Sequence, residues 1–169
     1  MLRRLLLFRH ARAAGLLAPD GSGAAPGGDH ARPLVPSGQQ DAVEVGAELA
    51  IRGWIPDAVL SSDSARTRQT WACLSVALGS PPVRFDHALY NADAETLIEE
   101  IGLVGDDVRT LLVLAHNPGL QELAWELTGE DVGLATANAL LLCSEAPTWP
   151  EALRPRRWRV EALVRPKGR

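Results

Sequence analysis

Residues 5–10 read LLLFRH, an uninterrupted apolar run that leads directly into an arginine and a histidine. A short run without polar positions is typical of a strand that is covered on both faces, as in parallel sheets. Residues 110–116 read TLLVLAH and repeat this pattern, again with a histidine at the end. The two stretches therefore predict two buried parallel strands, each carrying a histidine at its carboxyl end.

The rest of the chain alternates between strand-like and helix-like patterns. Further strands are expected at residues 58–60, 83–85, 139–143 and 158–164, with the last two either paired as a hairpin or lying apart. Helices are expected at residues 37–53, 64–78, 94–104 and 118–128. This order predicts a single domain over residues 1–169 with an α/β fold, a three-layer sandwich in which helices cover both faces of a mostly parallel sheet.

Three helix starts and one helix face have specific signals. The Ser61-Ser62-Asp63 cluster is expected to cap the helix that follows the second strand. Ser37 and Gln40 have the spacing of a capping box at the start of the first helix. Asn117 and Pro118 suit the N-cap and first positions of the helix after residue 116. The face of the first helix that is expected to be buried carries Val43, Ala47, Ala50 and Ile51.

Composition excludes several classes of function. The 169 residues carry a formal net charge of −4, with 46% hydrophobic and 22% charged residues, which favours an ordinary globular protein without a nucleic-acid partner. No run of about 18 apolar residues predicts a membrane span, and the apolar stretch near the start is too short for a signal peptide. Cys73 and Cys143 are expected to be buried thiols, and a cytoplasmic location is the simplest expectation.

Charged groups are expected to gather at one edge of the sheet. Ligands of such folds bind outside the carboxyl ends of the strands, where His10 and His116 lie, and Arg66 opens the helix after the second strand. Together with Arg9, these groups can bind a phosphoryl group through guanidinium hydrogen bonds and attack it with a neutral imidazole. The long segment 13–36, rich in Gly, Pro and Ala, is expected to be functional or mobile.

Four motifs resemble the signatures of the histidine phosphatase (phosphoglycerate-mutase-like) superfamily. They lie at residues 7–11, 32–38, 61–70 and 115–118, and the short length and Arg-His-Ala triplet are similar to SixA-type phosphohistidine phosphatases. The resemblance implies that His10 is the nucleophile. It places Arg9, Arg66 and His116 around the phosphoryl group, with Arg32 and Asn117 as further substrate contacts. Ala11 stands where the family has glycine, which is tolerated if that backbone does not need a positive φ.

The substrate is expected to be phosphohistidine in a protein partner. Relatives with a longer insert carry a glutamate that protonates the leaving group, but this chain offers only Asp86, His87, Asp93 and Glu95 as candidate acids. An alkoxide needs such an acid and an imidazole leaving group needs little help. A phosphatase for small phosphate esters and a non-catalytic phosphate-binding module remain alternatives. No cofactor is expected, and the histidines, His30 included, show no metal-ligand spacing along the chain.

Overall fold

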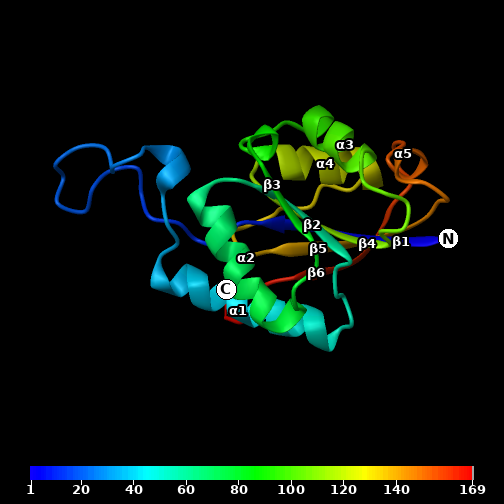
Figure 1. Ribbon diagram of the computed structural model, residues 1–169, viewed down its shortest axis with the longest axis horizontal. Helices are drawn as coiled ribbons and strands as arrows, with labels where there is room; N and C mark the ends of the chain where they lie inside the picture. Colours follow the sequence, from blue (N-terminus) through cyan, green and yellow to red (C-terminus); the bar gives the residue numbers. More distant parts are fainter. Residues whose placement is uncertain (169) are drawn as a thin grey trace.

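A six-stranded sheet forms the centre of the computed structural model, which describes residues 1–168 (Figure 1). The elements, in chain order, are β1 (Leu2–Arg9), η1 (Asp29–Ala31), α1 (Pro36–Ile51), β2 (Ala58–Ser62), α2 (Ala65–Leu78), β3 (Val83–Asp86), η2 (His87–Leu89), α3 (Ala94–Gly102), β4 (Thr110–Ala115), α4 (Gly119–Thr128), β5 (Ala139–Glu145), α5 (Trp149–Ala152) and β6 (Arg159–Val164).

The strand order is β3-β2-β4-β1-β5-β6, and the first four of these strands are parallel to one another. β5 runs antiparallel to β1, and β6 runs antiparallel to β5, so the last two strands pair directly with each other. The α/β fold with a mostly parallel sheet is therefore confirmed, and the question left open for the two final strands is answered by the hairpin.

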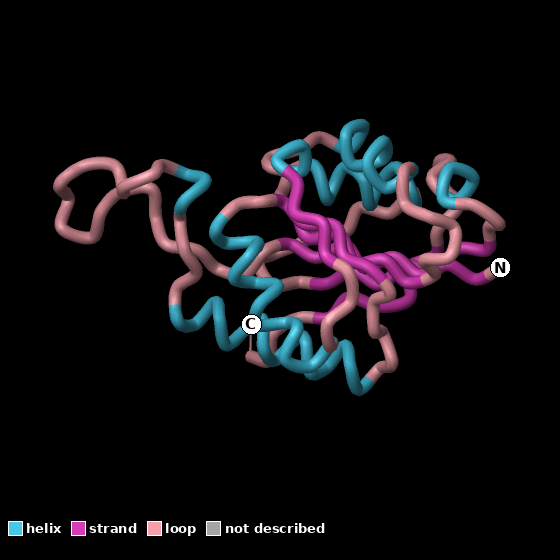
Figure 2. Tube along the Cα trace, viewed as in Figure 1, coloured by secondary structure: helices cyan, strands magenta, loops and turns pink. Residues whose placement is uncertain are grey.

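Helices cover both faces of this sheet, with α1 and α2 on one side and α3, α4 and α5 on the other (Figures 1 and 2). Side chains along β1 alternate between the two faces of the sheet. Leu5 and Leu7 belong to the core under α3 and α4, whereas Leu6 and Phe8 belong to the core under α1 and α2. All four side chains are fully buried, which explains why this strand has no polar position. No helix within residues 1–168 is long and apolar enough to cross a membrane.

The expected face of the first helix is wrong. Val43 and Ile51 are 44% and 81% exposed, whereas the buried face of α1 carries Ala42, Val45 and Leu49. The periodicity allowed either face, and packing against α2 selects the one that carries Gly46, which lies against the backbone of Leu74 in α2.

Three expected helix caps are also corrected. α1 begins at Pro36 after Val35, without a side-chain cap from Ser37. α2 is capped by Ser64, whose side chain accepts a hydrogen bond from the Thr67 amide, and the preceding Ser61 and Ser62 belong to β2. α4 has Pro118 at its N-cap position, and Asn117, one residue earlier, donates from its side-chain amide to Gln121 and to the Leu134 carbonyl.

The expectation that both cysteines are buried has a mixed outcome. Cys143 is buried as predicted, whereas Cys73 is only half-buried. Of the tryptophans on α2 and α4, Trp71 lies in the core and Trp125, which is 54% exposed, lines a surface pocket.

Candidate active site

The sheet register brings His10 and His116 side by side. Arg9 pairs with Ala115 at the last step of the β1–β4 ladder, so the residue that follows each strand leaves the sheet at the same edge. The two imidazole rings lie with their centroids 5.1 Å apart and are 8% and 2% exposed, respectively. The predicted meeting of these two histidines is thus present in the fold.

The ring of His10 is held in one tautomer. Nδ1 lies 2.8 Å from the carbonyl oxygen of Ala11, which can only accept, so Nδ1 carries the proton. The lone pair is therefore on Nε2, which accepts a hydrogen bond from Nε of Arg66 at 3.3 Å. Burial, with a smaller contribution from the charges of Arg66, Arg9 and Arg32, lowers the pKa of His10 to about 4. The imidazole is consequently neutral at physiological pH, with Nε2 available as a nucleophile.

His116 is also held neutral, with the opposite tautomer. Its Nδ1 accepts from a terminal nitrogen of Arg66 at 3.2 Å, so Nε2 carries the proton and donates to Oγ of Ser62 at 2.8 Å. Burial, followed by the neighbouring His10 and Arg66, lowers the pKa of His116 to about 3. Ser62 ends β2, next to β4, so the same sheet edge supplies the partner that fixes this ring.

Arg66 is the group that connects the two histidines. It lies in the first turn of α2 and is only 3% exposed, with one guanidinium nitrogen directed to His10 and another to His116. The position depends on the Ser64 cap and on Thr70, whose hydroxyl donates to the Arg66 carbonyl and accepts from the Ala11 amide. Thr70 thus joins the helix to the segment that follows His10.

Asp29 is a site residue that the sequence did not reveal. Its backbone carbonyl and its Oδ2 accept from the two terminal nitrogens of Arg66 at 2.8 and 3.1 Å, and its Oδ1 accepts from Nε of Arg32 at 2.9 Å. The hydroxyl of Tyr90 also donates to Oδ2. The Tyr90 hydrogen bond, with those from the two arginines, holds the pKa of Asp29 well below its usual range despite partial desolvation, so this carboxyl is ionised.

The remaining predicted residues, Arg9, Arg32 and Asn117, are held at the same pocket by different hydrogen-bond partners. Arg9 is half-buried and donates to the carbonyl of Leu134, and its pKa is lowered by desolvation. Arg32, in the loop after η1, is fixed by the carboxylate of Asp29 and the carbonyl of Ala14. Asn117 donates from its side-chain amide to the carbonyl of Leu134 at 2.8 Å.

These groups surround a pocket of about 390 Å³ at the carboxyl edge of the sheet. All six predicted site residues line it, namely Arg9, His10, Arg32, Arg66, His116 and Asn117. The sequence missed Asp29, Asn91 and Thr136, which also line it, because a short 3₁₀ helix and turns show no periodic pattern. Three guanidiniums around a neutral imidazole can bind a dianionic tetrahedral group and present a nitrogen nucleophile to it.

The backbone next to His10 tolerates alanine where the family pattern has glycine. Ala11 does not adopt a positive φ and is fully buried, so its methyl group causes no backbone strain. Gly38 in α1 is different, because a Cβ there would lie 2.2 Å from the carbonyl oxygen of Arg12. This glycine lets α1 pack directly against the segment that follows the nucleophile.

The four candidate proton donors lie outside this pocket. Asp86 caps η2 through the Ala88 amide, and Asp93 caps α3 through the Thr96 amide. Glu95 is exposed in the first turn of α3. His87 lies 3.1 Å from the carboxylate of Asp63, outside the pocket wall.

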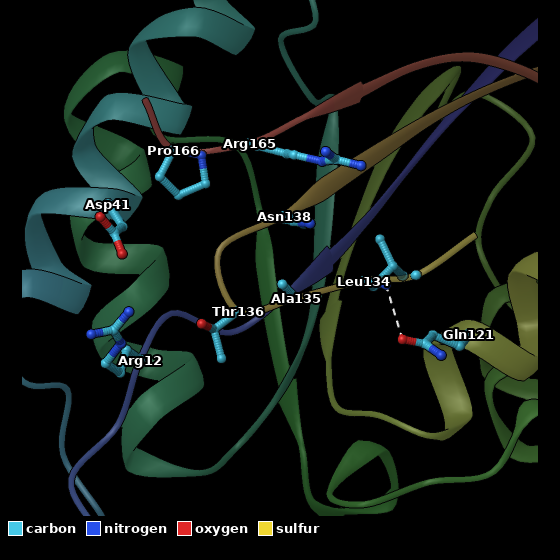
Figure 3. A pocket seen from close by; sticks show the side chains of 10 residues that line it. Arg12, Asp41, Gln121, Leu134, Ala135, Thr136, Asn138, Arg165 and Pro166 are labelled. Atoms are coloured by element: carbon cyan, nitrogen blue, oxygen red, sulfur yellow. Dashed lines mark hydrogen bonds between the residues drawn. The ribbon is translucent and has the colours of Figure 1, made fainter. Parts of the chain in front are cut away.

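A second, larger hollow of about 520 Å³ adjoins the pocket (Figure 3). Arg12 and Thr136 line both spaces, so the two lie next to each other. Its walls carry Arg165 and Asp41 on the side of α1 and β6, and Gln121 with Leu134 on the side of α4. A wide surface recess therefore lies beside the pocket that His10 and His116 line.

Comparison with known proteins identifies the family of this chain. Residues 5–100 match the histidine phosphatase superfamily (branch 1), and the chain belongs to this superfamily. It is 33% identical to an uncharacterized chloroplastic protein of Arabidopsis thaliana over 97% of this chain and 78% of that protein. It is 41% identical to an uncharacterized protein of Mycobacterium tuberculosis over 76% of each chain. The family makes the protein a phosphatase.

Solved structures extend the likeness over the whole fold. The "putative phosphohistidine phosphatase SixA" of Nakamurella multipartitia superposes with a TM-score of 0.83 at 27% identity, covering 99% of this chain and 98% of that one. The protein histidine phosphatase SixA complexed with tungstate has a TM-score of 0.80 at 20% identity, with coverage of 96% and 97%, and shares the fold. Among histidine phosphatases, the chain is thus of the SixA type in its architecture.

Proposed function

We propose that this protein removes phosphoryl groups from phosphohistidine in a protein partner, using His10 as the nucleophile and no metal ion in the chemical step. The observation that carries the proposal is the state of His10, a neutral ring with Nδ1–H bound to a carbonyl and Nε2 directed toward Arg66. Such a ring can form a bond to phosphorus without first losing a proton.

In the first half-reaction, Nε2 of His10 attacks the phosphorus of the substrate. A P–N bond to His10 forms as the P–N bond of the substrate breaks, and the substrate imidazole, protonated on its other nitrogen, leaves as a neutral ring. Arg9, Arg66 and Arg32 bind the phosphoryl oxygens, whose charge they neutralise in the transition state. His116 accepts a hydrogen bond from Arg66 on Nδ1 and so helps to hold that guanidinium in position for the phosphoryl oxygens.

In the second half-reaction, water attacks the phosphorus of phospho-His10. A P–O bond forms, the P–N bond breaks, and the water protons remain with the released phosphate or pass to solvent. The ring of His10 leaves as the neutral tautomer from which it began, because Nδ1–H stays bound to the Ala11 carbonyl throughout. The cycle closes without a cofactor.

The preference for phosphohistidine over an ester rests on the shortage of a proton donor. An alkoxide leaving group needs a positioned acid. The carboxyl of Asp29 lines the pocket, but hydrogen bonds from Tyr90 and the arginines lower its pKa, so it has no proton to donate. An imidazole that already carries a proton on its other nitrogen leaves as a neutral ring and needs no acid from the enzyme. The recess beside the pocket, with Arg12 and Arg165 on its walls, also leaves room for the protein segment that carries the phosphohistidine.

The deciding experiment is a side-by-side assay with a phosphohistidine-bearing protein domain and with simple phosphate monoesters, each with the wild-type chain and with His10→Ala. We expect kcat/KM for the phosphohistidine protein to exceed that for the esters by about 100-fold or more, within the range that a missing general acid explains. A preference for esters would favour a small-molecule phosphatase. If His10→Ala kept both activities, His10 would not be the nucleophile.

A further inference from the structure

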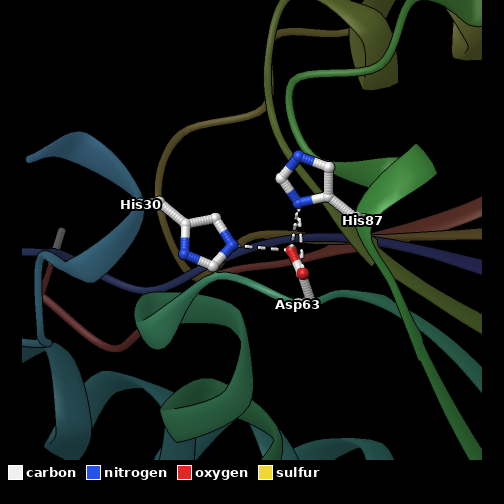
Figure 4. A group of neighbouring side chains, drawn as sticks. All are labelled: His30, Asp63 and His87. Atoms are coloured by element: carbon white, nitrogen blue, oxygen red, sulfur yellow. Dashed lines mark hydrogen bonds and ion pairs between the residues drawn. The ribbon is translucent and has the colours of Figure 1, made fainter. Parts of the chain in front are cut away.

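A second group of histidines lies outside the phosphate pocket. His30 in η1 and His87 in η2 approach the carboxylate of Asp63, which follows β2, from two sides (Figure 4). Nε2 of His30 is 2.7 Å from Oδ1 of Asp63, and Nδ1 of His87 is 3.1 Å from Oδ2. The three residues are 33 and 24 positions apart in sequence, which is why spacing along the chain gave no sign of them.

These side chains have the composition of a transition-metal site. Two imidazoles and one carboxylate are ligands that Zn²⁺ accepts, with a water completing a tetrahedral set. Zinc bonds of about 2.0–2.1 Å require the ligand atoms to be about 3.3 Å apart. The ligand atoms of the group all lie within 4.8 Å of one another, so small rotations of the side chains reach that arrangement.

The geometry points to a binding site for one divalent transition-metal ion, such as Zn²⁺, held by Nε2 of His30, the carboxylate of Asp63 and Nδ1 of His87, with water as the fourth ligand. The ligand side chains are 40%, 23% and 74% exposed, so an ion has a direct path from solvent. The ring nitrogens that would bind it already point at the carboxylate rather than away from it.

The site is separate from the phosphoryl chemistry but mechanically joined to it. None of the three ligands lines the phosphate pocket. Tyr90 lies between the histidine–aspartate group and the pocket, because its ring centroid is 4.8 Å from that of His30 and 5.5 Å from that of His116. Its hydroxyl donates to Asp29. An ion would tie η1 to η2 and to the start of α2, and so hold Asp29 against Arg66.

An alternative account is that the group forms only ion pairs when the histidines are protonated. Exposed pairs of this kind contribute little to stability. The two accounts differ in whether a metal ion binds with a defined stoichiometry and whether removal of any one of the three residues abolishes that binding.

The test measures Zn²⁺ binding by titration calorimetry and Co²⁺ binding by the visible d–d absorption that distinguishes low-coordinate from octahedral Co²⁺. The variants are His30→Gln, Asp63→Asn and His87→Gln. The matched control is Asp86→Asn, which removes a carboxylate charge next to His87 while retaining the side-chain oxygen that caps η2. A further variant, His10→Ala, removes one ring of the His10–His116 pair, which could bind a metal ion adventitiously.

We expect one ion per chain in the wild type, in Asp86→Asn and in His10→Ala, with a low-coordinate Co²⁺ spectrum. Each of the three ligand variants should bind about 100-fold more weakly or worse, since loss of even an outer-shell partner costs about 10- to 100-fold. Equal binding by wild type and Asp63→Asn, or loss of the ion in His10→Ala, would overturn the proposal. Because binding is read without any substrate, its failure is distinguishable from failure of the proposed phosphatase reaction.

Discussion

The four histidines of this chain form two pairs with similar ring separations and opposite surroundings. The centroids of His10 and His116 are 5.1 Å apart, and those of His30 and His87 are 5.5 Å apart. The inner pair is buried and faces Arg66, whereas the outer pair is more exposed and faces the carboxylate of Asp63.

The difference shows that the neighbouring charge, rather than the distance between rings, decides what a histidine pair can do. Arg66 donates hydrogen bonds to the inner rings and, with burial, keeps them neutral, which suits attack on an anion. Asp63 can only accept, so it draws the N–H groups of the outer rings, or a cation in their place. The first arrangement favours phosphoryl transfer and the second favours metal binding.

The largest expected effect comes from exchanging one ring of each pair for glutamine. His10→Gln should lower kcat/KM for phosphohistidine by about 10⁴-fold or more, as loss of a nucleophile does in other covalent enzymes. His30→Gln, assayed in chelator-treated buffer, should lower it by less than about tenfold. Similar losses in both variants would show that the two pairs do not have separate roles.

Removing the arginine that joins the inner pair should have the next largest effect. Arg66→Ala should lower kcat by about 10³-fold and also raise the inhibition constant of vanadate. Both follow because the guanidinium binds the phosphoryl oxygens in the ground state as well as in the transition state. Arg66→Lys serves as the control, since it retains the charge but not the planar donors. An unaltered vanadate constant in Arg66→Ala would place the phosphoryl group elsewhere.

The depressed pKa of the inner rings can be observed directly. With a pKa of about 4, below the ordinary value of about 6.5, His10 stays neutral as the pH falls from 8 to 5, whereas an ordinary histidine would retain only about 3% of its neutral form at pH 5. The ring C–H resonances of His10 and His116 in a pH titration by NMR should move by no more than about a tenth of the full protonation shift over this interval. A midpoint near 6.5 for His10 would show that burial and the arginines do not control its charge.

The smallest expected effect concerns the partner of His116. Ser62→Ala removes the oxygen that accepts from Nε2–H and so frees the ring to change tautomer. Loss of such an orienting partner should lower kcat by about tenfold with little change in KM, and ring ¹⁵N shifts should report a mixture of tautomers. Ser61→Ala is the control, because that hydroxyl donates to the Ser62 carbonyl and does not contact His116. A tautomer unchanged in Ser62→Ala would assign the fixation of this ring to Arg66 alone.

The sequence predicted those parts of the site that follow from strand patterns and from short motifs. His10 and His116 follow apolar strands, and a parallel sheet then forces them to one edge. Asp29 and Tyr90 were not predicted because Asp29 opens the short helix η1 and Tyr90 follows the short helix η2, where contacts between distant segments decide the position of each side chain. The face of α1 was wrong for a related reason, since periodicity fixes the spacing of buried positions but not which of two possible faces meets α2.

The measurement that tests the central claim most directly is trapping of the phosphorylated enzyme. The wild-type chain is mixed with a phosphohistidine-bearing protein, quenched in alkali within milliseconds, and digested for mass spectrometry. We predict an acid-labile, alkali-stable phosphoryl group on His10, and no such group in His10→Ala. A phosphoryl group on another residue, or turnover with none on His10 at any time point, would contradict the account.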